Sequence, residues 1–291
     1  MSLASACVAV SPQPPYQPPP QTPPQVCYRH PDRRAGVRCQ RCDRSICPAC
    51  MNQASVGFHC PECARGGRQR VIPARAMRTQ PVATFALVAA NLAIFVADAV
   101  SSGRLTTNAL GEIARKGALY GPAVAAGDWW RPITSGFLHI GLLHVGFNMF
   151  LLYQLGMLLE PAIRKGPFLA LYFLSLLGGS FAVLVYAPDQ VTVGASGAVF
   201  GLMAAAFIAL RSRGIDPFST GIGGLIVLNL ALTFLIPDIS KAGHIGGLIA
   251  GAIGGAIFWW WGPRLPRNSP LPMIACLVLA GALYVGCLVV V

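Results

Sequence analysis

The chain has 291 residues, of which 54% are hydrophobic and only 11% are charged. Soluble domains are about 25% charged, so this composition excludes an ordinary soluble protein and predicts an all-α protein that crosses a membrane several times. The net charge is +12, and its basic residues cluster before the first apolar run and in alternate later connections. That distribution indicates membrane orientation and argues against a nucleic-acid partner.

Residues 1–26 contain eight prolines, with glutamine and serine, and almost nothing that could form a core. This composition predicts a disordered, partly polyproline tail. Residues 64–80 form a basic linker that contains glycine and proline. Between these two segments lies a stretch rich in cysteine, residues 27–63, which we expect to form a separate small module.

Four pairs of cysteine or histidine, each with two residues between its members, lie within residues 27–63. This spacing lets both side chains of a pair bind one tetrahedral Zn²⁺, so eight ligands predict two structural zinc ions. Because the segment is too short to bury much core, the metal would supply most of its folding free energy. The alternative is a disulfide framework, which the reducing cytoplasm expected for this segment disfavours. The candidate ligands are Cys27, His30, Cys39, Cys42, Cys47, Cys50, Cys60 and Cys63.

This spacing resembles a B-box or a related cross-brace zinc finger. The resemblance implies that the first and third pairs (Cys27, His30, Cys47, Cys50) share one ion and that the second and fourth (Cys39, Cys42, Cys60, Cys63) share the other. B-boxes usually close with histidines and this segment closes with two cysteines, so His59 remains an alternative ligand in the second site. The role implied is structural or partner-binding, with a cytoplasmic protein as the partner.

Seven apolar runs follow, most of them roughly 17–22 residues long, which is the length that crosses a hydrocarbon layer about 30 Å thick. Six runs form a core over residues 81–265, and the seventh is an additional C-terminal helix within residues 266–291. The fifth run is the shortest and contains many glycines. The expected spans are residues 82–100, 142–159, 167–187, 193–210, 221–236, 242–261 and 271–291.

Basic residues in short loops mark the cytoplasmic side of a membrane protein. If the arginine-rich linker is cytoplasmic, the first span runs outward, and three later basic pairs also fall inside: Arg164/Lys165, Arg211/Arg213 and Arg264/Arg267. We therefore expect a multi-pass protein of the plasma membrane with a cytoplasmic N-terminus and an external C-terminus. The long connection over residues 101–141 then lies outside.

Four polar residues are expected at one depth in the membrane. Ser196 lies about three residues into the fourth span and His244 about two residues into the sixth. His144 and Asn148 lie in the first turns of the second span. Since all three spans enter from the outside, the four side chains fall within roughly 10 Å of the outer face.

Small residues at intervals of four in the fourth and sixth spans allow close helix packing, which would bring Ser196 to His244. A serine hydroxyl beside an imidazole is a candidate nucleophile with its general base. His144 and Asn148 share a helix face and can donate hydrogen bonds to a developing oxyanion. The fourth and sixth spans carry no acidic residue at this depth, so we expect a dyad without a third carboxylate. Each feature alone is also common in helix packing, and the prediction depends on their coincidence.

Residues 81–291 resemble the rhomboid intramembrane serine proteases. The resemblance is carried by Trp130-Arg131, by His139 with His144-x3-Asn148, by Gly194-Ala195-Ser196-Gly197, and by Ala242-Gly243-His244-x2-Gly247-x3-Gly251. It implies a six-helix bundle, here followed by a seventh helix, with Ser196 as nucleophile and His244 as general base and acid. His144, Asn148 and the Ser196 N–H would stabilise the oxyanion, and Trp130 and Arg131 would be structural. Some members have tyrosine where Phe200 stands, and its ring would still stack on His244.

The function that these features predict is cleavage of single-pass transmembrane proteins near the outer membrane surface, by a serine endopeptidase embedded in lipid and without a catalytic cofactor. The alternative is a non-catalytic scaffold that binds transmembrane helices and recruits cytoplasmic partners through the zinc module. A transporter is disfavoured, because the polar residues gather at one face and not at the midplane.

Overall fold

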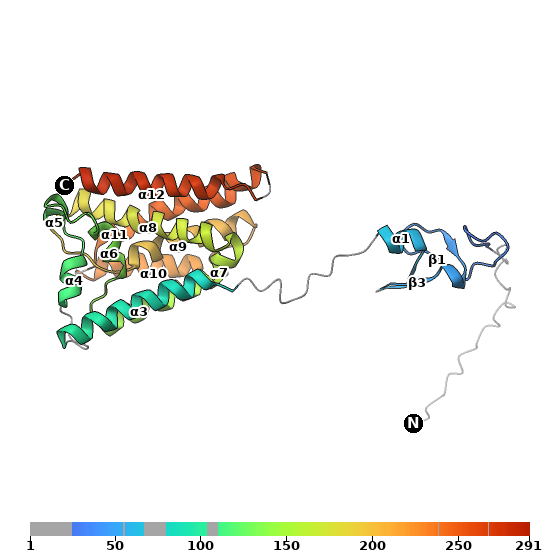
Figure 1. Ribbon diagram of the computed structural model, residues 1–291, viewed down its shortest axis with the longest axis horizontal. Helices are drawn as coiled ribbons and strands as arrows, with labels where there is room; N and C mark the ends of the chain where they lie inside the picture. The colour runs from blue at the N-terminus through green and yellow to red at the C-terminus, as the bar shows by residue number, and fades with distance from the viewer. Residues whose placement is uncertain (1–24, 55, 67–79, 104–109, 238, 267) are drawn as a thin grey trace, which may run out of the picture. The chain divides into compact units, whose positions relative to one another are not determined.

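The computed structural model (Figure 1) describes residues 25–54, 56–66, 80–103, 110–237, 239–266 and 268–291. Its contacts divide the chain into two units, Met1–Pro73 and Ala74–Val291. The tail predicted for residues 1–26 and the linker predicted for residues 64–80 lie mostly outside the described residues.

Two small antiparallel hairpins make up most of the first unit. Strand β1 (Val37–Arg38) pairs with β2 (Ser45–Ile46), and β3 (Asn52–Gln53) pairs with β4 (Phe58–His59). The 3-10 turn η1 (Pro48–Cys50) joins the hairpins, and helix α1 (Pro61–Gly66) follows them. Among the residues described in this unit, Ile46 is the one apolar side chain other than cysteine that is fully buried. Hydrophobic burial therefore contributes little to its stability.

The second unit is an all-α bundle, and each of the seven predicted spans is a helix in the part of the chain that the structure describes. Five helices are long and apolar enough to cross a membrane, whereas α9 and α10 have 17 and 14 residues. The prediction of an all-α polytopic membrane fold is confirmed. The helices are α3 (Val82–Ser102), α7 (Gly141–Ile163), α8 (Lys165–Tyr186), α9 (Ser196–Ser212), α10 (Ile222–Leu235), α11 (Lys241–Ala256) and α12 (Leu271–Val289).

Short elements complete the unit. Between α3 and α7 the chain forms α4 (Glu112–Gly117), α5 (Gly121–Ala125), α6 (Arg131–Thr134) and the 3-10 turn η2 (Ser135–Phe137). Helix α11 continues through a π-helical turn, η3 (Ile257–Trp261), and a 3-10 turn, η4 (Gly262–Arg264).

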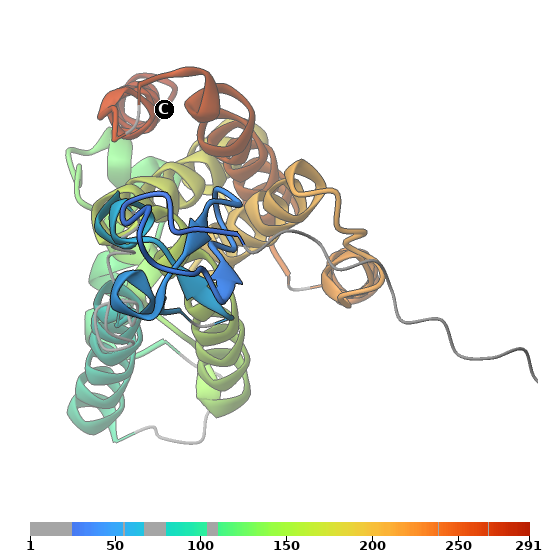
Figure 2. The same ribbon diagram turned by 90° about the vertical axis from the view of Figure 1, so that its right-hand side faces the viewer.

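Helix α11 packs most extensively, against both α8 and α9. Helix α12 packs on α8 and lies along one edge of the bundle in both views (Figures 1 and 2). Helix α3 packs mainly against α7. Helix α10 makes few contacts, with α9 and α11, so it is the most loosely held of the seven. We call the end of the bundle at which α9 begins the Ser196 end.

Glycines set the closeness of α9 and α11. A Cβ atom at Gly247 would lie 2.6 Å from the carbonyl carbon of Gly197, and one at Gly251 would overlap the backbone of Gly201. Only hydrogen fits at these crossing points, so the two backbones touch. Since Gly197 follows Ser196 and Gly243 precedes His244, this contact sets the separation of the two candidate catalytic residues.

We expect Gly251→Ala to separate α9 from α11, because the new methyl group would meet main-chain atoms, which cannot rotate away. The expected cost is about 3 kcal/mol or more of unfolding free energy, measured by denaturation in lipid bicelles. Gly281→Ala is the matched control on α12, where a Cβ meets nothing within 4 Å. An unchanged denaturation midpoint for Gly251→Ala would contradict the close packing.

Two buried carboxylates hold helix starts in place. Glu160 of α7 accepts hydrogen bonds from the backbone N–H groups of Ala83 (2.9 Å) and Thr84 (2.8 Å) and from the Thr84 hydroxyl (2.7 Å). Asp98 of α3 accepts from the N–H groups of Gly111 (3.1 Å) and Ala114 (2.9 Å) at the start of α4. Each carboxylate satisfies donors that a helix start leaves without partners. The sequence analysis did not identify either residue.

Candidate functional site

Ser196 is the first residue of α9, so the prediction that it lies about three residues inside the helix is wrong. Thr192 pairs instead with Leu119, each N–H donating to the other's carbonyl at 2.9 Å. Gly194 then takes a φ of +126°, which disfavours a residue with a side chain, and its N–H donates to Ser135 O. These tertiary bonds keep residues 192–195 out of the helix. The first N–H groups of α9, beginning with that of Ser196, therefore lack helical acceptors and carry positive partial charge.

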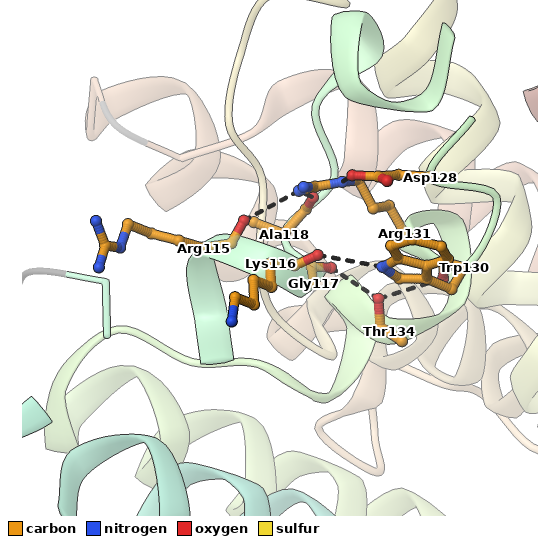
Figure 3. Close-up of polar contacts among 8 residues, drawn as sticks. All are labelled: Arg115, Lys116, Gly117, Ala118, Asp128, Trp130, Arg131 and Thr134. Atoms are coloured by element: carbon orange, nitrogen blue, oxygen red, sulfur yellow. Dashed lines mark hydrogen bonds and ion pairs between the residues drawn. The ribbon is translucent and has the colours of Figure 1, made fainter. Parts of the chain in front are cut away.

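The loop before α7 supports this entry segment (Figure 3). The Arg131 guanidinium donates to the carbonyls of Arg115 (3.1 Å) and Ala118 (2.7 Å) and pairs with Asp128 at 2.7 Å. Trp130 Nε1 donates to Lys116 O, and the Thr134 hydroxyl donates to Gly117 O. Together these donors satisfy the carbonyls that the end of α4 leaves open, directly before Leu119. As expected, Trp130 and Arg131 have structural contacts.

His144 lies against Gly194. The backbone N–H of Ile140 donates to His144 Nδ1 (3.4 Å), so the ring proton of the neutral imidazole is on Nε2. A Cβ at Gly194 would lie 2.8 Å from that Nε2 and 3.7 Å from Ser196 Oγ. The structure thus brings the Nε2 donor of His144 and the Ser196 hydroxyl to the same small space. Glycine at position 194 leaves that space open.

Asn148 is buried one turn further along α7, and its amide donates to the carbonyl of His144 at 2.9 Å. His139 stands beside His144, with ring centroids 5.0 Å apart, and its Nε2 accepts the N–H of Ala195 at 3.4 Å. His139 therefore holds the residue before Ser196.

His244 is buried in the first turn of α11. Its ring stacks on Phe200 with centroids 4.0 Å apart and planes 20° from parallel, which is the stacking expected from the sequence. Phe200 lies four residues after Ser196 on α9, so the imidazole covers the helix face that carries the serine. No hydrogen bond joins Ser196 Oγ to His244 among the described residues, and their relation is defined by this shared face and by the glycine contact between α9 and α11.

The sequence analysis missed Thr233, the residue on α10 that contacts the imidazole. Its hydroxyl oxygen lies 2.7 Å from His244 Nδ1. The sequence did contain a signal for this residue. Thr233 is a polar residue near the end of an apolar span, and that end is expected on the same side of the membrane as Ser196. Thr233 lies in the fifth span and carries no carboxylate, so the absence of acidic residues from the fourth and sixth spans did not indicate it.

A cavity of about 20 Å³ adjoins Ser196. The residues that line it include four with hydroxyl side chains: Ser135, Ser180, Thr192 and Ser240. This volume holds about one water molecule. The site therefore has room for a water molecule beside the serine.

The Rhomboid domain family model matches residues 126–261, a range that contains Ser196, His244, His144 and Asn148. The putative rhomboid protease YdcA of Bacillus subtilis (strain 168) is 34% identical over 136 residues, which cover 45% of this chain and 68% of YdcA. The chain belongs to the rhomboid family. The rhomboid protease GluP of the same organism is 34% identical over 213 residues, which cover 71% of this chain and 41% of GluP. RHOMBOID-like protein 5 of Arabidopsis thaliana is 39% identical over 142 residues, 46% of each chain.

This rhomboid chain thus spans less than half the length of GluP and of RHOMBOID-like protein 5. The family model covers neither the cysteine-rich unit nor the helices α3 and α12. The family model therefore accounts for the helices from α7 to α11, whereas the B-box resemblance of residues 27–63 stays a prediction.

The cysteine-rich unit brings eight side chains into two clusters, each with its ligand atoms within 4.8 Å of one another. The clusters are Cys27, His30, Cys47 and Cys50, and Cys39, Cys42, Cys60 and Cys63. This is the alternation that the cross-brace resemblance implies, and it includes Cys60 and not His59. The described cysteines form no disulfide.

The distances fit tetrahedral zinc. His30 Nδ1 lies 3.8, 3.5 and 3.4 Å from the sulfurs of Cys27, Cys47 and Cys50, and the sulfurs of Cys42 and Cys60 are 3.7 Å apart. Tetrahedral Zn²⁺ with ordinary bond lengths separates sulfur from nitrogen by about 3.6 Å and two sulfurs by about 3.8 Å. Both clusters could therefore hold a metal ion without rearrangement.

The local electrostatics favour the thiolate at some of these cysteines and oppose it at others. Burial raises the pKa of the Cys27 thiol, but hydrogen bonds from the backbone N–H groups of Arg29, Cys47 and His30 outweigh it and lower the pKa to about 6. In the other cluster burial raises the pKa of Cys39 as well, and backbone N–H groups again lower it to about 6. Burial raises the pKa of Cys50 to about 11, and hydrogen bonds with Cys60 and Cys42 raise the pKa of Cys63 to about 12. Each cluster therefore has one thiol whose pKa favours the thiolate that binds zinc and one whose pKa opposes it.

Proposed function

We propose that this rhomboid-family protein is an intramembrane serine endopeptidase with Ser196 as nucleophile and His244 as general base. The observation that carries the proposal is the stacking of His244 on Phe200, one helical turn from Ser196 on the same face of α9. The similarity to the rhomboid protease GluP and to the putative rhomboid protease YdcA supports the same reaction class.

In this mechanism Ser196 Oγ attacks the carbonyl carbon of the scissile bond while His244 Nε2 accepts the hydroxyl proton. The imidazolium returns that proton to the leaving amine, and water then hydrolyses the acyl-enzyme. The Ser196 N–H, His144 Nε2–H and the Asn148 amide are the donors proposed for the oxyanion. The hydrogen bond from Ile140 to His144 Nδ1 supports this role, because it leaves the ring proton on Nε2.

The proposed substrates are single-pass transmembrane proteins, cut near the outer membrane surface. A helix must unwind locally before its carbonyl can be attacked, so small or helix-breaking residues should flank the cut. The basic pairs between spans support an orientation with the N-terminus in the cytoplasm and the C-terminus outside the plasma membrane.

A fluorophosphonate reagent that esterifies activated serines tests the proposal on the full chain in detergent. We expect labelling of the wild type, at one site, and loss of labelling in Ser196→Ala and His244→Ala. Ser175→Ala is the matched control, because Ser175 is also buried and donates to a carbonyl of its own helix, Leu171 O. Labelling that survives Ser196→Ala, or a folded wild type that is never labelled, would favour a scaffold that binds transmembrane helices without cleaving them.

We also propose that residues 27–63 bind two structural zinc ions in the two clusters described above. Zinc there would hold the hairpins together and supply no catalytic chemistry, since each ion would have four protein ligands. The proposed partner of this module is a cytoplasmic protein. The proposed division of the chain is a tail (1–26), the zinc module (27–63), a linker (64–80), the protease core (81–265) and an additional helix (266–291).

A further inference from the structure

Helix α10 buries polar residues on a helix that is otherwise apolar. Of its residues only Gly223, Asn229 and Thr233 are buried, while Val227 and Leu228 are more than half exposed. Asn229 and Thr233 are four residues apart, so they share the face that α10 turns toward the bundle. Buried polar groups are costly unless they have partners, and the Thr233 hydroxyl has two.

The first partner is the carbonyl of Asn229, at 2.7 Å from Thr233 Oγ1, and the second is His244 Nδ1, also at 2.7 Å. A hydroxyl has one proton, and a carbonyl can only accept. If the proton went to His244, the oxygens of Thr233 and Asn229 would stand 2.7 Å apart without a hydrogen between them. Thr233 therefore donates to Asn229 O, as threonines within helices commonly do, and its oxygen accepts a hydrogen bond from Nδ1–H of His244.

This assignment also defines the protonation of the other ring nitrogen of His244, Nε2. A neutral imidazole with its proton on Nδ1 has its lone pair on Nε2. Phe200 covers the ring face, and Thr233 holds the Nδ1 edge, so Nε2 is the nitrogen left for chemistry.

We propose that Thr233 is the positioning residue of the site, a neutral substitute for a third catalytic carboxylate that holds His244 in the tautomer able to accept the Ser196 proton. This inference rests on the proposed proteolysis for its kinetic consequence, whereas the tautomer can be measured without it. A carboxylate would also stabilise the imidazolium by its charge. Threonine is neutral, so it only orients the imidazole ring and fixes its tautomer.

The test compares Thr233→Val with Thr233→Ser in the full chain. Valine keeps the shape and removes the hydroxyl, and serine restores it. We expect Thr233→Val to lower kcat about 10- to 100-fold on a transmembrane substrate with KM unchanged, and Thr233→Ser to recover most of the loss. Thr84→Val is the matched control: Thr84 is equally buried, and its hydroxyl makes a hydrogen bond of the same 2.7 Å length, to Glu160. It should lower stability and leave kcat as it is.

A second readout is independent of activity. The chain has five histidines, and ¹⁵N NMR of labelled protein in lipid reports which ring nitrogen carries the proton, with the His244 signals identified by their loss in His244→Gln. We expect a protonated Nδ1 in the wild type and in Thr233→Ser, and a shift toward protonated Nε2 in Thr233→Val.

The outcomes separate the two proposals. An active wild type with equal kcat in Thr233→Val, or a wild type with the proton on Nε2 of His244, would overturn the role of Thr233. A protein that shows the Nδ1–H tautomer, lost in Thr233→Val, but never cleaves a substrate would support the positioning of His244 while refuting the proposed protease.

Discussion

Replacing Ser196 by alanine is expected to lower the rate of substrate cleavage by about 10⁴-fold or more, to the background of the assay. The hydroxyl supplies the atom that forms the covalent bond, and Ser196 lies on the face of α9 that the His244 imidazole covers. Cleavage of a transmembrane substrate in proteoliposomes, followed by mass spectrometry of the fragments, measures the loss.

The combination with His244→Ala sharpens this prediction. Nucleophile and base act on one proton, so the double variant should be no slower than either single variant. If the rate loss of the double variant equalled the product of the two single losses, the two residues would act separately. Folding of Ser196→Ala is checked by the denaturation midpoint, which should stay near the wild-type value because Ser196 Oγ makes no hydrogen bond with a described residue.

Removing zinc is expected to unfold the cysteine-rich unit and to leave the bundle folded. The unit buries Ile46 and few other apolar groups, so metal binding, worth roughly 10 kcal/mol or more in small zinc modules, must supply most of its stability. Metal analysis should find two zinc ions per chain. A chelator should then make the arginines of this unit, such as Arg41, cleavable by trypsin.

Single variants test the pairing of the ligands. Cys50→Ala should empty the cluster that contains His30 and lower the content to about one zinc ion per chain. Cys276→Ala, which removes a buried cysteine of α12, should retain two. Zinc content that stays at two in Cys50→Ala, or trypsin resistance that survives full chelation, would refute the two-site structure.

The helices were predictable from the sequence because a membrane allows a spanning segment few alternatives to helix. Runs of apolar residues therefore located all seven, and the glycine spacing on α9 and α11 indicated their close approach. The start of α9 was not predictable in this way. Residues 193–195 are as apolar as the helix that follows. They are not helical because Leu119, Ser135 and His139, all distant in sequence, bind the backbone of residues 192–195.

Thr233 and Glu160 illustrate a second limit. Hydropathy gives the depth of a side chain in the membrane, but it does not give the rotation of its helix about the axis. Thr233 contacts His244 only because α10 turns that face inward, and Glu160 binds α3 for the same kind of reason. The depth of the candidate site could thus be predicted, and the group that contacts the imidazole could not.

Arg131, Trp130 and Thr134 bind main-chain oxygens of residues 115–118, and they leave the side chains of Arg115 and Lys116 exposed and without a part in these bonds. The anchor therefore depends on the donors and not on the side chains at positions 115 and 116. Substitutions at those two positions can change the chemistry of the protein's exterior while the segment that leads to Ser196 keeps its main-chain support.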